Sequence, residues 1–92
     1  MARYDTNTDH AAAIALEALS FVLNEPLRAE RFIDITGLTP DNLRGRLNDP
    51  ATLAAILAFL EGHEPDLLAC ADSTGHTPEA LVAARGMLEQ AA

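Results

Sequence analysis

The turn at residues 36–47, TGLTPDNLRGRL, carries the polar side chains that are best placed for chemistry. It holds a glycine that can end one helix, a Thr-Pro pair that can begin another, and then Asn42, Arg44 and Arg46. Amide and guanidinium groups on the first turns of a helix that follows a tight turn are the donors that a helix-turn-helix presents to DNA bases. The segment therefore predicts a nucleic-acid contact at these three residues as one candidate function.

The net charge of the chain opposes that function. All six cations are arginines, and fourteen carboxylates bring the formal net charge to -8. Because proteins attract the phosphate backbone through a positive field, a chain this acidic repels nucleic acid at long range. The arginines are nevertheless concentrated in residues 28–46, where four of them meet three carboxylates, so this stretch is locally positive.

The same turn occurs twice in the chain. DITGLTPDNL (34–43) and DSTGHTPEAL (72–81) align at an offset of 38 residues, with the Asp, Thr, Gly, Thr, Pro and Leu identical. At the positions of the three candidate contact residues, the second copy holds Ala80, Val82 and Ala84, none of which can read a base. What the copies share is a helix-ending glycine, a capping threonine and a helix-starting proline. We therefore interpret the turn itself as a structural corner.

The single cysteine, Cys70, predicts neither a disulfide framework nor a cysteine-based zinc site. It aligns with Phe32 in the first copy, so we expect a small buried core residue. A catalytic thiolate needs a neighbouring histidine or an electropositive pocket, whereas the residues near Cys70 on its helix include Asp66 and Asp72, which would raise the pKa of the thiol.

The three histidines, His10, His63 and His76, are scattered along the chain, and no pair has the i, i+4 spacing of a helical metal site. We expect all three at the surface or in turns. No phosphate-binding glycine loop or nucleophile elbow is present in the sequence either. The sequence therefore predicts no catalytic residue, no metal ligand and no cofactor, and indicates a protein that is not an enzyme.

Prolines and glycines divide the chain into the elements that must position these residues. Five prolines each stand where the first turn of a helix accepts a residue without an N–H, and a sixth start lies at Thr8-Asp9. Alanine and leucine, 18 and 14 residues, favour helix over strand. We predict helices over residues 8–24, 26–35, 40–48, 50–61, 65–74 and 78–90.

The expected fold is an all-α, compact bundle of about six short helices. A chain of 92 residues suits one domain, which we place at residues 8–92 after a flexible N-terminus at 1–7. The repeat divides the domain into pseudo-repeated three-helix units at about 8–48 and 49–92. The first helix of each unit is almost without a polar side, so we expect helices 1 and 4 to pack together at the centre.

The first helix of the chain is not expected to be a secretion signal or a membrane span. Asp5 and Asp9 make its leader acidic and Glu17 interrupts the apolar run, which is also shorter than the roughly 20 residues that a span needs. With a single cysteine, this predicts a protein of the cytoplasm.

The repeated Thr-Gly-x-Thr-Pro-Asp/Glu-x-Leu pattern, with ALEALSFVL before the first copy and LAAILAFL before the second, resembles a known family. It is an uncharacterised proteobacterial domain-of-unknown-function family of short, acidic, all-helical proteins, and the resemblance spans roughly residues 9–88. It implies a bacterial, cytoplasmic, single-domain protein. It implies no activity, ligand or site residue.

Three functions follow as hypotheses. The first is a non-enzymatic helical protein–protein interaction module, as a homodimer or with a protein partner, because an incompletely covered apolar helix leaves an association surface. The second is a nucleic-acid-binding helix-turn-helix that uses residues 36–47, with contacts from Asn42, Arg44 and Arg46. The third is an acidic mimic of nucleic acid that binds a basic partner.

Overall fold

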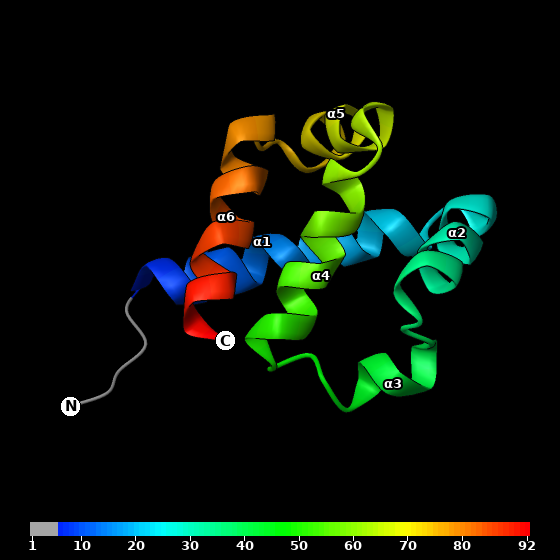
Figure 1. The fold of residues 1–92 in the computed structure, drawn as a ribbon. Coiled ribbons are helices and arrows are strands. Elements are labelled where there is room, and N and C mark those ends of the chain that lie inside the picture. The colour runs from blue at the N-terminus through cyan, green and yellow to red at the C-terminus, as the bar shows by residue number, and fades with distance from the viewer. Residues whose placement is uncertain (1–5) are drawn as a thin grey trace.

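The computed structural model describes residues 6–92, which fold into six helices joined by short turns, with no strand among them (Figure 1). The helices are α1 (Thr6–Leu23), α2 (Pro26–Thr36), α3 (Pro40–Arg44), α4 (Pro50–Glu61), α5 (Glu64–Thr74) and α6 (Pro78–Ala91). The all-α prediction is confirmed. Of the N-terminal segment predicted to be flexible, residues 1–5 lie outside the described residues, whereas Thr6 and Asn7 already belong to α1.

The helices form one compact unit. The radius of gyration is 12.4 Å, close to the roughly 12 Å expected for a folded chain of this length. In Figure 1, α1 runs behind α4 and α6, α5 lies across the top, and α2 and α3 lie on the same side of α4. This is the compact helical bundle that the sequence predicts.

The most extensive packing in the core joins three helices, α1, α4 and α6, where we expected the first and fourth helices alone at the centre. α1 and α4 do contact each other, but α6 packs more extensively against both of them. The reason is the buried stripe of α6, Leu81, Ala84 and Leu88, which recurs at the spacing of one helix face and joins the buried side chains of the other two helices. The division into two equivalent three-helix units stays a prediction, because α3 and α6 differ in length and packing.

The helix predicted over residues 40–48 is wrong at its C-terminal end, because α3 stops at Arg44. Residues 45–48 form turns in which the Arg46 amide donates to the Leu43 carbonyl and the Asp49 amide donates to the Arg46 carbonyl. Leu43 is the only buried residue of this short helix. With so little apolar surface to bury and a glycine at residue 45, nothing favours a longer helix here.

The N-terminus of α4 follows the expected capping pattern. The Asp49 carboxylate accepts hydrogen bonds from the Ala51 amide at 3.2 Å and from the Thr52 hydroxyl at 2.9 Å, and Pro50 occupies the first turn. Most of α4 is then buried, and its open side carries Ala51 and Ala58, which are exposed, and Ala55, which is half-buried. The helix is therefore well covered on every side but one.

Side-chain contacts fix α2 against the rest of the bundle. The rings of Phe32 and Phe59 meet edge to face, with centroids 5.2 Å apart and an interplanar angle of 86°. The Arg28 guanidinium lies 3.8 Å from the centroid of the Phe21 ring and donates to the Phe21 carbonyl. Arg31 forms an ion pair with Asp66, so α2 is also tied to α5.

Candidate interaction surface

The two copies of the turn have the same local geometry. Gly37 and Gly75 close α2 and α5 with φ of 75° and 79°, in the left-handed region that favours glycine. One residue before each glycine, the hydroxyls of Thr36 and Thr74 donate to carbonyls one turn back, both at 2.7 Å. These hydrogen bonds and the left-handed backbone account for the Thr-Gly pair that the two copies share.

The helix starts after the two turns also match. Thr39 accepts from the Asn42 amide at 3.3 Å, and Thr77 accepts from the Ala80 amide at 3.0 Å. Both threonines therefore cap the next helix in the same way, and each is followed by a proline in the first turn. Within the turn the copies differ at Leu38 and His76, and they differ again in the helices that follow.

The three candidate nucleic-acid contacts are exposed, but two of them are engaged locally. The Asn42 side-chain oxygen accepts from the Thr39 amide at 3.4 Å and from the Thr39 hydroxyl at 3.0 Å, which completes a capping box. The Arg44 guanidinium lies 2.9 Å from the Asp41 carboxylate. Arg46, in the turn after α3, makes no ion pair with any of residues 6–92.

An apolar groove runs between α2 and α4. Its volume is about 260 Å³, and its lining residues are Arg31, Ile35, Ala58, Phe59, Gly62 and His63. We call it the α2–α4 groove. Its most exposed apolar side chain is Ile35, which keeps 66% of its surface accessible, while Phe59 is only 6% exposed and belongs to the core. The groove therefore joins a buried aromatic ring to an open aliphatic side chain.

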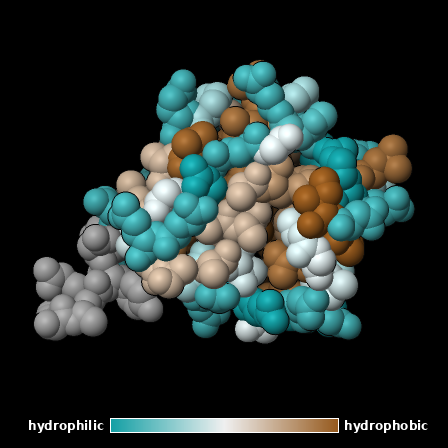
Figure 2. Space-filling model, in the orientation of Figure 1, coloured by the Kyte–Doolittle hydropathy of each residue, from teal (hydrophilic) through white to brown (hydrophobic). Residues whose placement is uncertain are grey.

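Figure 2 shows this side of the molecule in space-filling form. A beige band of mildly apolar surface runs over α4, and brown, strongly apolar surface lies next to it on the side of α2 and α3 (Figure 2). The exposed alanines of α4 and Ile35 of α2 contribute to this surface. Leu27, at the other end of α2, is 70% exposed. The two most exposed large apolar side chains among residues 6–92 thus both belong to α2.

One wall of the α2–α4 groove is formed by Arg31, whose charge is already paired. The Arg31 guanidinium lies 5.6 Å from the centroid of the Phe59 ring and pairs with Asp66 of α5. This arrangement covers one edge of the ring and satisfies both charges. The groove consequently offers apolar contact to an incoming group, and Arg31 offers little free charge.

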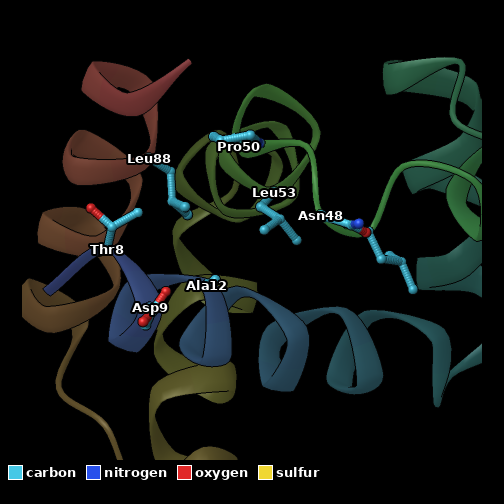
Figure 3. Close-up of a pocket in the computed structure, with 8 residues that line it drawn as sticks. Thr8, Asp9, Ala12, Asn48, Pro50, Leu53 and Leu88 are labelled. Carbon is cyan, nitrogen blue, oxygen red and sulfur yellow. The ribbon is translucent and has the colours of Figure 1, made fainter. Parts of the chain in front are cut away.

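A second hollow, of about 300 Å³, lies where the N-terminal end of α1 meets α4 and α6. Figure 3 shows Leu53 and Leu88 reaching into it from α4 and α6, above Ala12 of α1. Its polar lining is confined to Thr8, Asp9 and Asn48, of which Asp9 and Asn48 are exposed. These groups lie at the rim of a mostly apolar hollow and do not converge on one point as catalytic groups do.

A third hollow, between α1 and α5, is bordered by a hydrogen-bonded pair of side chains that links distant parts of the chain. His76 in the second turn lies 2.5 Å from the Glu17 carboxylate of α1. Glu17 also lines the hollow, with Ser20, Asn24 and Ser73 contributing further polar groups. The pair connects the second turn to α1, a contact that the first turn does not make, since Leu38 stands there and is buried.

Cys70 is a buried thiol, as expected from its place in the repeat. Burial raises the pKa of the Cys70 thiol, and a hydrogen bond with Thr74 and the charge of Arg28 only partly oppose that rise. Among residues 6–92, no group of three or more His, Cys, Asp or Glu side chains is arranged to hold a metal ion. His10 and His63 are exposed, and His76 is half-buried in its turn.

Reasoning from the sequence missed the α2–α4 groove. It assigned the open apolar surface to the Ala-rich first and fourth helices, whereas much of it comes from α2. A signal was present, because Ile35 and Leu27 lie two turns apart on α2 and Phe32 points to the core from a different side. An amphipathic helix with apolar residues on more than one side cannot bury all of them against a single neighbour.

None of the helices formed by residues 6–92 has the length and apolar character needed to cross a membrane. Comparison with known proteins found a match between residues 8–91 and the model of a family described as "Protein of unknown function (DUF3572)". No curated protein and no solved structure matched the chain at a significant level. The family match covers the six helices almost from end to end. This chain therefore belongs to the DUF3572 family of proteins of unknown function.

Proposed function

We propose that this protein is a non-enzymatic helical module that binds another protein chain through the α2–α4 groove. The observation that carries the proposal is the exposure of Ile35. Its side chain lines the groove and is 66% exposed, while Phe32 and Arg31 of the same helix pack against α4 and α5. Burying apolar surface stabilises a complex by roughly 25 cal/mol per Å², and an exposed aliphatic side chain next to a concave apolar surface is a typical anchor.

The surroundings of the groove support this function. Arg31 is paired with Asp66 and stacked near Phe59, so this edge is rigid before any partner arrives. A preformed surface loses less conformational entropy on binding than a mobile one. The open alanines of α4 extend the apolar area without adding side chains that must be ordered.

Nucleic-acid binding through residues 36–47 stays a weaker prediction. The exposed Arg46, which makes no ion pair with any of residues 6–92, favours it, whereas Asn42 already completes a capping box and Arg44 already pairs with Asp41. If it binds nucleic acid, Arg44→Glu with Arg46→Glu abolishes a gel shift that weakens with added salt. No specific contact favours the acidic-mimic hypothesis over binding through the groove.

We also infer that the two halves of the chain are diverged copies of one three-helix unit. The matching geometry of the two turns supports this, from Thr36 to Thr39 and from Thr74 to Thr77. Since the turns serve architecture, function belongs to the parts in which the copies differ, which include α3 and the surface of α2. A buried, unpaired Cys70 suits a reducing compartment, and we propose the cytoplasm.

Photo-cross-linking in the cells that produce the protein tests the proposed function. A photoreactive amino acid replaces Ala58, which lines the groove, or Ala13, an equally helical and exposed alanine of α1 that serves as the matched control. The expected result is a defined protein adduct from position 58 and none from position 13. Equal labelling at both positions, or no adduct at position 58, contradicts the proposal.

A further inference from the structure

The two ends of α4, the helix that forms one wall of the α2–α4 groove, differ in the sign of the exposed charges that have no ion-pair partner among residues 6–92 and do not cap a helix. Arg44 and Arg46 lie at the end where α4 begins, and both are exposed; Arg44 pairs there with Asp41, and Asp49 caps α4, so Arg46 is the charge left for a partner. Asp34, near the last turn of α2, and Glu64, the first residue of α5, lie at the end where α4 finishes, and both are exposed too. Within the described part of the chain, neither of these carboxylates nor Arg46 takes part in an ion pair. The groove is thus flanked by charges that a matching surface would pair.

The same face of a second copy, rotated so that its α4 runs in the opposite direction, has the matching distribution of charges. Figure 1 shows α2 and α3 on the same side of α4. A two-fold rotation that sets two α4 helices antiparallel therefore brings the α3 end of one protomer to the α2 end of the other. Arg46 then meets Asp34 of the partner subunit and Glu64 of the partner subunit. An interface of this kind is self-complementary, as two-fold symmetry requires.

The open side of α4 fits the same rotation. Ala51 and Gly62, and likewise Ala55 and Ala58, stand at equal distances from one midpoint of the helix. Across the axis, each small residue faces another small residue, so the two helices can approach to about the lower end of the 8–10 Å range of packed helices. Ile35, which projects beside Ala58 and Gly62, then covers the flank of the contact.

The charges elsewhere on the chain are compatible with this contact. Asp49 is the carboxylate nearest Arg46 in sequence, and it is held by the Ala51 amide and the Thr52 hydroxyl. The net charge of -8 makes two copies repel each other at long range, but physiological salt screens exposed charges beyond about 8 Å. The groove also borders residues 28–46, the one of the three segments 1–27, 28–46 and 47–92 that has a net positive charge, where this repulsion is weakest.

We infer that the occupant of the α2–α4 groove is a second copy of this chain, bound with the two α4 helices antiparallel. This inference rests on the proposed function and specifies its partner. The apolar contact comes from Ile35 and the small residues of α4. Register and orientation come from Arg46 pairing with Asp34 and Glu64 across the two ends.

The oligomeric state of the purified chain tests the inference, by light scattering over a concentration series. The wild type is expected to pass from monomer to dimer as concentration rises. Ile35→Glu is expected to raise the dissociation constant at least about tenfold, because it places a charge in the apolar contact. Leu68→Glu, on α5, also puts a charge at an exposed leucine but lies outside the groove, and its dissociation constant is expected to equal that of the wild type.

A charge exchange tests the orientation. Arg46→Glu and Glu64→Arg are each expected to weaken the dimer about threefold or more, and the double variant is expected to recover most of that loss. Circular dichroism verifies that every variant stays folded. A double variant no better than the single ones overturns the antiparallel pairing.

The failure of the dimer and the failure of the proposed function are distinguishable. A wild type that remains monomeric at the highest concentrations, or a dimer that Ile35→Glu does not weaken, overturns the inference. If position 58 nevertheless cross-links to a different protein in cells, the groove still binds a protein chain and only the identity of the occupant is wrong. If position 58 forms no adduct at all, the proposed function fails with the inference.

Discussion

The two copies of the Thr-Gly-x-Thr-Pro turn have matching caps and lead into very different helices. The first leads into α3, five residues long, with one buried side chain. The second leads into α6, fourteen residues long, which packs against α1 and α4. The comparison shows that capping residues decide where a helix begins, while burial of the following side chains decides how far it continues.

The 38-residue alignment shows which residues differ where the first copy ends its helix and the second continues. Gly45 and Arg46 in the first copy occupy the places of Ala83 and Ala84 in the second. Ala84 is 2% exposed in the core, a place that a guanidinium cannot share without losing its water. The first copy therefore ends its helix early and leaves Arg46 at the surface.

Exchanging these residues should have the largest effect. Ala84→Arg places an unpaired charge and a long side chain in the core, and we expect it to lower the free energy of unfolding by about 3 kcal/mol or more. Arg46→Ala, the reciprocal change, should alter it by less than about 0.5 kcal/mol. Urea denaturation followed by circular dichroism measures both. Similar values for the two variants would contradict the assigned difference between α3 and α6.

The shared leucine of the two copies gives the next comparison. Leu81 is 1% exposed within the contact of α6 with α1 and α4, and Leu43 is 4% exposed under the short α3. We expect Leu81→Ala to cost about 3–4 kcal/mol and Leu43→Ala about 2 kcal/mol, because the peripheral site can close around the cavity more easily. Thermal or urea unfolding measures the difference. A larger loss at Leu43 would show that α3 is more important to the core than its length indicates.

The capping threonines should behave more alike. Thr77→Ala removes the cap of α6 and should cost about 1 kcal/mol, as is typical of N-cap threonines. Thr39→Ala removes the same cap together with the hydrogen bond that the Thr39 hydroxyl donates to the Asn42 side chain, and should cost a similar amount. Equal losses support a common architectural role for the two turns. If only one cap contributes to stability, their similarity is in sequence alone.

The smallest expected effect on stability comes from Cys70, which stands at the position of Phe32 in the first copy. Because burial raises the pKa of the Cys70 thiol, the folded state keeps its proton at a pH where the unfolded chain has lost it. This contribution to stability is complete below the ordinary pKa of a thiol, about 8.5, and disappears as pH rises through the raised value in the folded protein. Stability curves at increasing alkaline pH should therefore fall more steeply for the wild type than for Cys70→Ala. Parallel curves would mean that the thiol is not shielded from water.

The elements of the fold that depend on local chemistry were predictable. Proline starts, threonine caps and glycine stops all act within one turn of helix, so five helices lie close to their expected limits. The early end of α3 was not, because it depends on Arg46 having no place in the core. The central place of α6 was missed because the sequence does not show which helices pack against one another, and α6 packs against both α1 and α4.

The candidate surface was predictable only in part. The excess of alanine on α4 indicates an open apolar side, and the structure has one at Ala51 and Ala58. The groove also needs Ile35 to lie beside Gly62, which depends on how the whole of α2 is docked by Phe32 and Arg31. Contacts between residues far apart in the chain set that position, and local patterns do not encode it.

Methyl spectra of isoleucine-labelled protein test the central claim most directly, because the chain carries its own controls. Of its four isoleucines, Ile35 lines the groove, whereas Ile14 and Ile56 are 5% and 0% exposed in the core. If a second copy fills the groove, the Ile35 methyl resonance moves as the protein is concentrated, and those of Ile14 and Ile56 stay in place. An Ile35 resonance that is unchanged from the lowest to the highest concentration, or that moves no more than the core resonances do, would contradict the account.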